Sequence, residues 1–198
     1  ECGIDIVTDG EVRRENYIHY HCRFLKGIDF SNLTKKTART GNYDCYLPTI
    51  VDQVKFDKPF LSNEFKANQN ISSKPIKVTI PGPLTITDTI ADSYYNDNKK
   101  LGFDLSVAIN NEIKDLANAG CKYIQIDEPL FARKTEEAIS FGVENLERCF
   151  HGLPNEIEKI VHICCGYPDK IDAVDYPKAP LNSYNDLSSY LEDSNVDT

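Results

Sequence analysis

The sequence of 198 residues contains no methionine and no tryptophan, and it lacks any long apolar run. Its apolar stretches are interrupted by Asp, Lys or Pro well short of the roughly 20 residues that a membrane-spanning helix needs. The N-terminus shows no basic segment followed by an apolar one, so no secretory signal is indicated. We therefore expect a cytoplasmic protein that does not bind membranes.

The missing initiator methionine bears on the ends of the chain. The sequence opens on Glu-Cys-Gly-Ile-Asp, which is typical of a helix end running into a strand and not of a solvated tail. We expect residues 1–198 to be an internal piece of a longer protein, that is, one incomplete domain cut at both ends.

The charged residues also limit the function. There are 31 acidic and 22 basic side chains, for a formal net charge of −9, and no basic stripe that would neutralise phosphates. Nucleic acid is therefore a poor candidate partner. The seven cysteines are odd in number and irregularly spaced, so we expect reduced thiols and not a disulfide framework. Small-molecule chemistry is the better expectation.

The apolar pattern alternates strands with helices, which favours parallel βαβ units. The strands are predicted at Ile4–Thr8, Ile76–Ile80, Tyr123–Asp127 and Ile160–Cys164. The helices are predicted over 103–119 and 135–150, with shorter ones over 61–69 and 184–191. Residues 45–56 are expected to be extended, but Pro48 argues against a central strand there.

Two architectures fit four βα units, an open doubly wound sheet and a closed barrel. The doubly wound nucleotide-binding fold usually carries Gly-x-Gly-x-x-Gly after its first strand, and this sequence has no such motif. In a barrel, functional residues collect where strands end, and here these ends carry Glu11, Asp127, His162 and Cys164. A complete barrel takes about 250 residues. We therefore predict a partial (β/α)8 TIM barrel.

His162 and Cys164 are candidate metal ligands. They lie two apart on a predicted strand, so their side chains should point to the same side, and both are good ligands for zinc. Cys165 should point the other way. A His-x-Cys pair on a strand is also compatible with core packing, because free cysteine is among the most buried residue types.

Two acidic residues are candidates for binding a substrate. Asp127 ends an otherwise apolar strand, where a charged group needs a partner such as a ligand or another catalytic group. It could instead cap the following helix. Glu11 follows the first strand in Asp-Gly-Glu-Val-Arg-Arg, and this segment could instead be a solvated turn in which Arg13 or Arg14 pairs with a neighbouring glutamate.

Four motifs in this order and spacing resemble the C-terminal barrel of cobalamin-independent methionine synthases. They are Asp9-Gly10-Glu11, Pro81-Gly82-Pro83-Leu84-Thr85-Ile86, Ile124-Gln125-Ile126-Asp127-Glu128-Pro129 and His162-Ile163-Cys164. Each motif is modest by itself, but together they span nearly the whole chain.

The resemblance implies a zinc-dependent methyltransferase in which the homocysteine thiol binds a zinc ion held by a His, two Cys and a Glu. His162 and Cys164 would be the first two zinc ligands, and Glu11 and Asp127 would hold the substrate amino group. The remaining zinc ligands and a proton-donating His are expected beyond residue 198, so no catalytic residue is expected here apart from the metal site.

Three positions depart from the family pattern for the folate donor. Asp44 stands where the family has Arg, Thr89 where it has Trp, and Arg133 where it has Glu. A first alternative is therefore a related zinc thiol alkyl- or methyltransferase that uses another donor, such as a methyl-corrinoid. A second alternative is a zinc-free relative that serves as a binding module.

Overall fold

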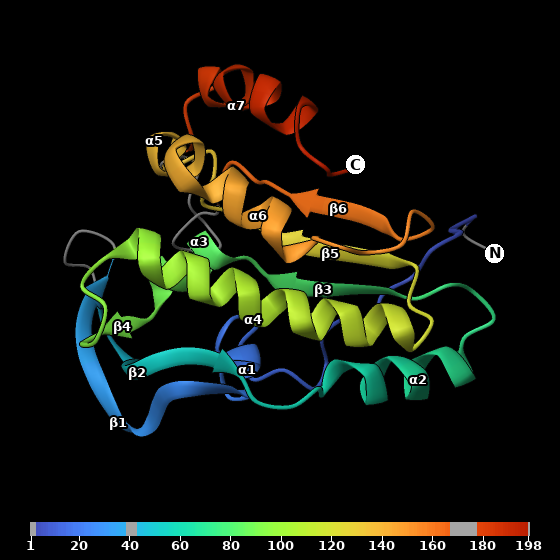
Figure 1. Ribbon diagram of the computed structural model, residues 1–198, viewed down its shortest axis with the longest axis horizontal. Coiled ribbons are helices and arrows are strands. Elements are labelled where there is room, and N and C mark those ends of the chain that lie inside the picture. Colours follow the sequence, from blue (N-terminus) through green and yellow to red (C-terminus); the bar gives the residue numbers. More distant parts are fainter. Residues whose placement is uncertain (1–2, 39–42, 167–177, 198) are drawn as a thin grey trace.

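The computed structural model describes residues 3–38, 43–166 and 178–197 of the chain. Three parallel strands form a sheet in the order β3-β5-β6, and a second sheet has the order β1-β2-β4 (Figure 1). The strands are β1 (Leu25–Ala38), β2 (Tyr43–Phe56), β3 (Lys77–Pro81), β4 (Ala91–Asp92), β5 (Tyr123–Asp127) and β6 (Glu158–His162).

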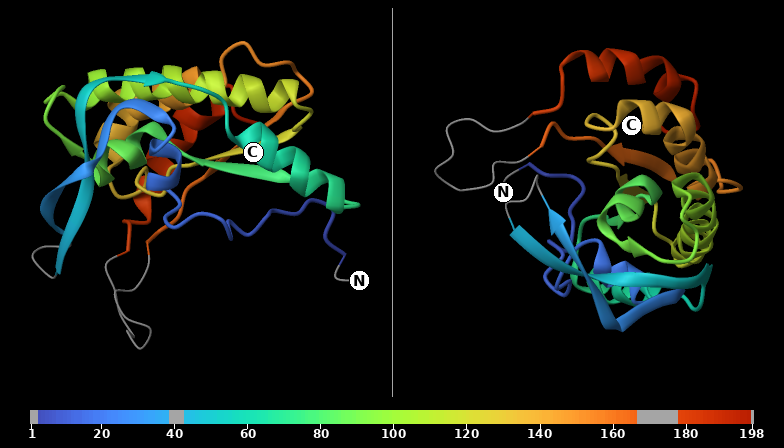
Figure 2. Two further views of the ribbon diagram at one scale, coloured as in Figure 1. Left: turned by 90° about the horizontal axis from the view of Figure 1, so that it is seen from below. Right: turned by 90° about the vertical axis from the view of Figure 1, so that its left-hand side faces the viewer.

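The helices cover the strands from several sides. Figure 2 shows α4 beside the parallel sheet, with the β1–β2 hairpin on one flank of the molecule and α7 on the opposite flank. The helices are α1 (His19–Cys22), α2 (Leu61–Ile71), α3 (Pro83–Thr89), α4 (Asn98–Asn118), α5 (Thr135–Glu137), the π-helix η2 (Ala138–Gly142), α6 (Val143–Cys149) and α7 (Asn182–Glu192). Among the described residues, no helix is long and apolar enough to cross a membrane.

The two faces of the parallel sheet differ in polarity. On one face Ile80, Ile124 and Ile126 are at most 1% exposed and join the hydrophobic core. On the other face Thr79 and Gln125, which pair in register, are only half-buried. Successive side chains of a strand alternate between faces, so this second face carries the polar side chains that β3 and β5 can offer to a ligand.

The register aligns the carboxyl ends of the strands. Pro81 of β3 pairs with Asp127 of β5, which in turn pairs with His162 of β6. The strand predicted at Tyr123–Asp127 is confirmed without a shift, whereas the observed β3 and β6 begin one and two residues away from the predicted bounds. This register brings Asp127 and His162, which were predicted at strand ends, to one edge of the sheet.

The predicted first strand is only partly confirmed. In the Ile4–Thr8 segment, Val7 makes a single parallel bridge to Ile76 beside β3. The Val7 backbone N–H donates to the carbonyl of Pro75 at 3.0 Å, and its carbonyl accepts from Lys77 at 2.8 Å. The four parallel segments are thus neighbours in chain order, but they form an open sheet within the described residues, so a closed barrel is not observed.

The hairpin of β1 and β2 corrects the sequence analysis. The expectation that Pro48 excludes a central strand was wrong, because β2 lies between β1 and β4 in its sheet. The antiparallel pairing passes from Leu47 opposite Thr34 to Thr49 opposite Asp29, so Pro48 sits where the ladder is irregular. Proline lacks a backbone N–H and is tolerated at such a bulge. β1 itself had no sequence-based prediction.

The long helices agree with their apolar spacing. α4 begins five residues before the predicted 103, because the Asp97 side chain accepts the backbone N–H groups of Lys99 and Lys100. It ends before Gly120, whose φ of +98° is the left-handed conformation expected just after a helix. The predicted helix over 135–150 is present as α5, η2 and α6 in succession.

Two helix N-termini are capped by carboxylates from other elements. Neither α2 nor α3 has a side-chain cap from its own N-cap residue. Glu112 of α4 accepts the backbone N–H groups of Phe60 and Leu61 at 3.1 and 2.8 Å, at the start of α2. Burial raises the pKa of Glu112 to about 7. The cap therefore fastens α2 to α4.

Glu128 caps α3 in the same way from the end of β5. It is fully buried and accepts the backbone N–H groups of Leu84 and Thr85, each at 2.9 Å, and the Thr85 hydroxyl at 2.7 Å. A Cβ atom on Gly82 would lie 2.2 Å from the Glu128 Cδ atom, so only glycine fits beneath this carboxylate. Burial raises the pKa of Glu128 to about 7, although the three donors oppose the shift.

We predict that Glu128→Ala lowers the free energy of unfolding by about 2–4 kcal/mol, because two buried N–H groups lose their acceptor. Glu136→Ala is the control, since Glu136 is exposed. The raised pKa means that the folded state binds a proton that the unfolded state releases between about pH 4.5 and 7. The wild type should therefore lose stability as pH rises through this window, and the variant should lose less. Urea unfolding at several pH values measures both effects, and equal loss in the control would contradict the cap.

Candidate functional site

A pocket opens at the carboxyl ends of the parallel strands. Its volume is about 600 Å³, within the usual range of ligand pockets. The predicted residues Glu11, Asp127 and His162 all line it, together with Thr79 and Gln125 from the polar face of the sheet. The structure thus brings three of the four predicted site residues to one cavity, although they are up to 151 positions apart in the sequence.

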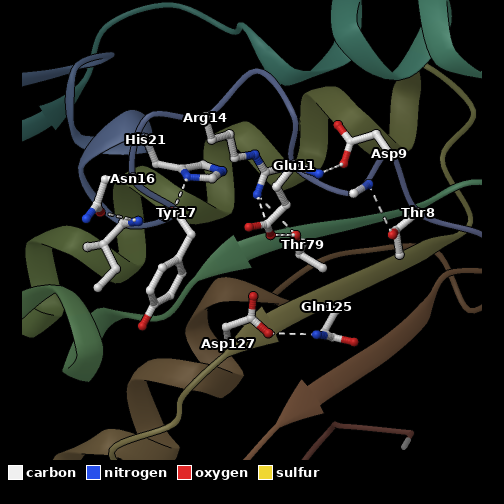
Figure 3. A network of polar contacts seen from close by, with 12 residues as sticks. Thr8, Asp9, Glu11, Arg14, Asn16, Tyr17, His21, Thr79, Gln125 and Asp127 are labelled. Carbon is white, nitrogen blue, oxygen red and sulfur yellow. Dashed lines mark hydrogen bonds and ion pairs between the residues drawn. The ribbon is translucent and has the colours of Figure 1, made fainter. Parts of the chain in front are cut away.

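Glu11 is held in a fixed orientation at the pocket wall. Its Oε1 atom accepts from Arg14 Nη1 at 2.9 Å and from the Thr79 hydroxyl at 2.6 Å, and the same Arg14 nitrogen donates to Thr79 at 3.1 Å (Figure 3). The backbone N–H of Glu11 donates to Asp9 at 2.9 Å, in a turn that gives Glu11 a φ of +56°. The Asp-Gly-Glu segment is therefore not a freely solvated turn, although its Glu–Arg pair does form.

Arg14 connects this carboxylate to the protein interior. Its side chain is 3% exposed, whereas that of Glu11 is 32% exposed. The buried imidazole of His21 lies beside Arg14, with Nδ1 bonded to the Tyr17 carbonyl at 3.0 Å (Figure 3). Burial and then the Arg14 charge lower the pKa of His21 to about 3, so this ring is neutral. Arg14 is thus the cation that balances Glu11.

Asp127 is held by a chain of bonds along the polar face of the sheet. Lys77 Nζ donates to Gln125 Oε1 at 2.6 Å, and Gln125 Nε2 donates to Asp127 Oδ1 at 2.6 Å. Burial raises the pKa of Asp127, and the Glu11 charge adds to the rise. The Gln125 hydrogen bond opposes it most, followed by the charges of His162 and Arg14. The other Asp127 oxygen points toward the side of the pocket that holds Glu11 (Figure 3). Two carboxylates thus face a common space.

The two predicted metal ligands lie in different surroundings. β6 ends at His162, so Cys164 lies beyond the strand and the same-side argument does not apply to it. His162 is exposed and lines the pocket, whereas Cys164 is half-buried and does not. Within the described part of the chain, no three His, Cys, Asp or Glu residues are grouped so as to hold a metal ion. His162 and Cys164 remain a predicted ligand pair.

The sequence analysis missed the residues that orient the two carboxylates. Gln125 lies two residues before Asp127 and therefore on the same face of β5, which strand alternation alone predicts. Thr79 precedes the Pro-Gly-Pro motif by the same interval. Arg14 had been considered as a partner of Glu11, but its burial could not be read from the sequence. No sequence feature indicated that Lys77 would bond to Gln125.

The fold and pocket define an α/β protein with a parallel sheet and an acidic pocket at its strand ends. The comparison with family models agrees: the model described as the catalytic domain of cobalamin-independent synthase matches residues 1–174. The chain belongs to this family.

Individual relatives support the assignment. The chain is 36% identical over 167 residues to the methionine synthase of Saccharolobus solfataricus, covering 84% of this chain and 48% of the relative. It is 33% identical over 192 residues to that of Sulfurisphaera tokodaii, covering 92% and 54%. The chain thus spans about half the length of the curated relatives that it matches.

A solved structure is similar over almost the whole chain. It is a B12-independent methionine synthase from Shewanella sp. W3-18-1 in complex with selenomethionine, with a TM-score of 0.85 and 34% identity over 98% of this chain and 57% of the other. The family predicted from the four motifs is therefore confirmed.

Because Arg14 is buried, we predict that Arg14→Met lowers the free energy of unfolding by about 1–3 kcal/mol, since Glu11 and Thr79 lose their shared donor. The adjacent Arg13, which is exposed and donates to Asn68 at 3.1 Å, provides the control. Arg13→Met should stay within about 0.5 kcal/mol of the wild type. Chemical denaturation of both variants measures this difference, and equal effects would show that Arg14 is not a structural anchor.

Proposed function

We propose that this chain carries part of the catalytic domain of a methyltransferase that methylates the thiol of homocysteine, as in methionine synthesis. The observation that carries the proposal is the pair Glu11 and Asp127 facing one pocket at the strand ends. Such a pair suits the ammonium group of an amino acid, because it supplies several oxygen acceptors and negative charge. The relatives named methionine synthase support the same reaction.

The two carboxylates take different parts in binding. Glu11 is already paired with Arg14, so it contributes oriented acceptor oxygens with little free charge. Within the part of the chain that the structure describes, the Asp127 side chain accepts from the neutral Gln125 amide, and burial and the Glu11 charge raise its pKa. An arriving ammonium group would neutralise this buried charge and relieve the repulsion between the carboxylates. Asp127 therefore provides most of the electrostatic attraction.

The proposed zinc site lies beside this amino-group site. The donor chemistry of His162 and Cys164 fits zinc, but the pair supplies two of the four ligands that the resemblance implies. Zinc, when bound, would lower the pKa of the substrate thiol so that it reacts as a thiolate. The protein residues have a separate role, because Glu11 and Asp127 hold the amino group so that the thiol end of the substrate reaches the His162 side of the pocket.

We also propose that the parallel strands form part of a (β/α)8 barrel. Val7, β3, β5 and β6 are neighbours in chain order, as barrel strands are, whereas a doubly wound sheet reverses its order at the binding crevice. The polar face with Thr79 and Gln125 would then be the barrel interior. This arrangement explains why the polar face of these strands lines the pocket.

The first test is methyl transfer to homocysteine by the full-length protein. Asp127→Asn should raise the homocysteine KM by about tenfold to a hundredfold, since it removes a charge-assisted bond. In the wild type, the raised pKa of Asp127 means that binding weakens as pH falls, starting above the range of an ordinary aspartate. This dependence should be reduced in Asp127→Asn. The control is Asp186→Asn at an exposed position of α7. An unchanged KM in Asp127→Asn would remove Asp127 from the site.

The second test concerns zinc. We expect the full-length protein to hold about one zinc ion per chain and Cys164→Ser to lower this content. Cys165→Ser is a matched control, because Cys165 is adjacent and similarly half-buried. Metal analysis by mass spectrometry decides the question. If Cys164→Ser retains the full zinc content, Cys164 is not a ligand.

The third test concerns the methyl donor. Asp44 is paired with Lys35 at 2.8 Å on the exposed hairpin, so its repulsion of an anionic donor is weaker than its charge alone suggests. Thr89 and Arg133 still lack the stacking surface and the acceptor that the family pattern supplies. We expect a lower kcat/KM with polyglutamyl methyltetrahydrofolate than with a methyl-corrinoid. Efficient folate turnover, with kcat/KM near about 10⁴ M⁻¹s⁻¹, would contradict this expectation.

A further inference from the structure

The pocket that holds the two carboxylates also has a cationic side chain in its lining. Arg133 lines the same cavity as Glu11, Asp127 and His162. It is exposed, in contrast to its buried neighbours Phe131 and Ala132. The cavity therefore combines negative charge at the strand ends with a positive charge on the segment that follows β5.

The backbone that carries Arg133 is fixed. The Phe131 N–H donates to the Glu128 carbonyl at 3.1 Å, and the Arg133 N–H donates to the Leu130 carbonyl at 3.0 Å. Phe131 and Ala132 are fully buried, so this turn is anchored directly to the end of β5. The guanidinium thus extends from a rigid base whose position relative to Asp127 is set by the fold.

Lys134, the residue after Arg133, has acidic partners within the described part of the chain, whereas Arg133 does not. Lys134 Nζ lies 2.6 Å from an Asp88 oxygen and 3.2 Å from a Glu137 oxygen, so its charge is balanced. Over the described ranges 3–38, 43–166 and 178–197, the Arg133 side chain has no hydrogen bond or ion pair with the protein. Its five N–H donors are available to a ligand in the pocket.

We propose that Arg133 is a specificity residue that binds a carboxylate of a substrate held in this pocket. The inference rests on the proposed function, because it takes Glu11 and Asp127 as the ammonium site. A guanidinium binds a carboxylate through two parallel bonds, which fixes orientation as well as charge. The carboxylate could come from the acceptor amino acid or from the methyl donor, and both sources present the same chemistry to Arg133.

The acceptor arm of the test measures binding to the full-length protein by calorimetry, independently of turnover. The probes are L-methionine and L-methioninamide, which share the ammonium and thioether groups and differ in the carboxylate. If the acceptor is the source, Arg133→Gln weakens methionine binding by about tenfold to a hundredfold and changes methioninamide binding by less than about twofold. Arg133→Lys restores part of the loss, because it returns the charge without the planar fork. Lys58→Gln, an exposed change outside the pocket, should change neither.

The donor arm compares the KM of carboxylate-bearing methyltetrahydrofolate with that of methylcobalamin in wild type and Arg133→Gln. A rise confined to the folate donor assigns the carboxylate to the donor. If Arg133→Gln alters neither methionine binding nor the folate KM, or weakens methionine and its amide equally, the proposal is overturned. If the wild type binds neither methionine nor its amide, the proposed function itself fails, an outcome that is distinct from a failure of Arg133 alone.

Discussion

The buried carboxylate of Glu128 is the interaction on which the arrangement of the site depends. It leaves the end of β5, passes over Gly82 and accepts the first N–H groups of α3, so it joins the ends of β3 and β5. Asp127, the adjacent residue, is thereby held at the pocket edge. A buried carboxylate is costly unless donors surround it, and the helix N-terminus supplies oriented donors and a favourable dipole. The three hydrogen bonds thus position Glu128 and offset part of the cost of burying its charge, while burial still raises its pKa to about 7.

Glu112 likewise caps the N-terminus of α2 with a carboxylate from another helix, outside the pocket. In both cases the capping residue is far from its helix in the sequence, by 51 positions from Leu61 and by 44 from Leu84. Local capping rules examine the residues next to a helix start, so they cannot identify such caps. This explains why α3, which starts at Pro83 without a cap of its own, was not predicted as a helix.

The fold was predictable where a short segment of sequence alternates between buried and less buried positions. β5 has alternating burial and a polar end, and its observed bounds, Tyr123–Asp127, are the predicted ones. Residues 45–56 were correctly expected to be extended, as β2, but β1 and its pairing with β2 were missed because a long antiparallel pairing with irregular register is not revealed by composition. The Ile4–Thr8 segment has strand composition but makes a single bridge, from Val7 to Ile76, so strand composition alone does not produce a hydrogen-bonded ladder. Tertiary pairing overrode propensity in both segments.

The sequence predicted which charged residues line the pocket, but not which of their charges are paired within the protein. The strand-end rule found Glu11, Asp127 and His162, because parallel strands bring their carboxyl ends to one edge whatever their separation in the sequence. It could not show that buried Arg14 compensates the charge of Glu11 whereas Asp127 accepts from the neutral Gln125 amide. This asymmetry has a chemical consequence. A pair of equal, uncompensated carboxylates would share a proton at the cost of ammonium binding, since like charges raise one pKa strongly. Because Glu11 is paired with Arg14 while Asp127 accepts from a neutral amide, more of the negative charge of Asp127 is available to a cation in the pocket.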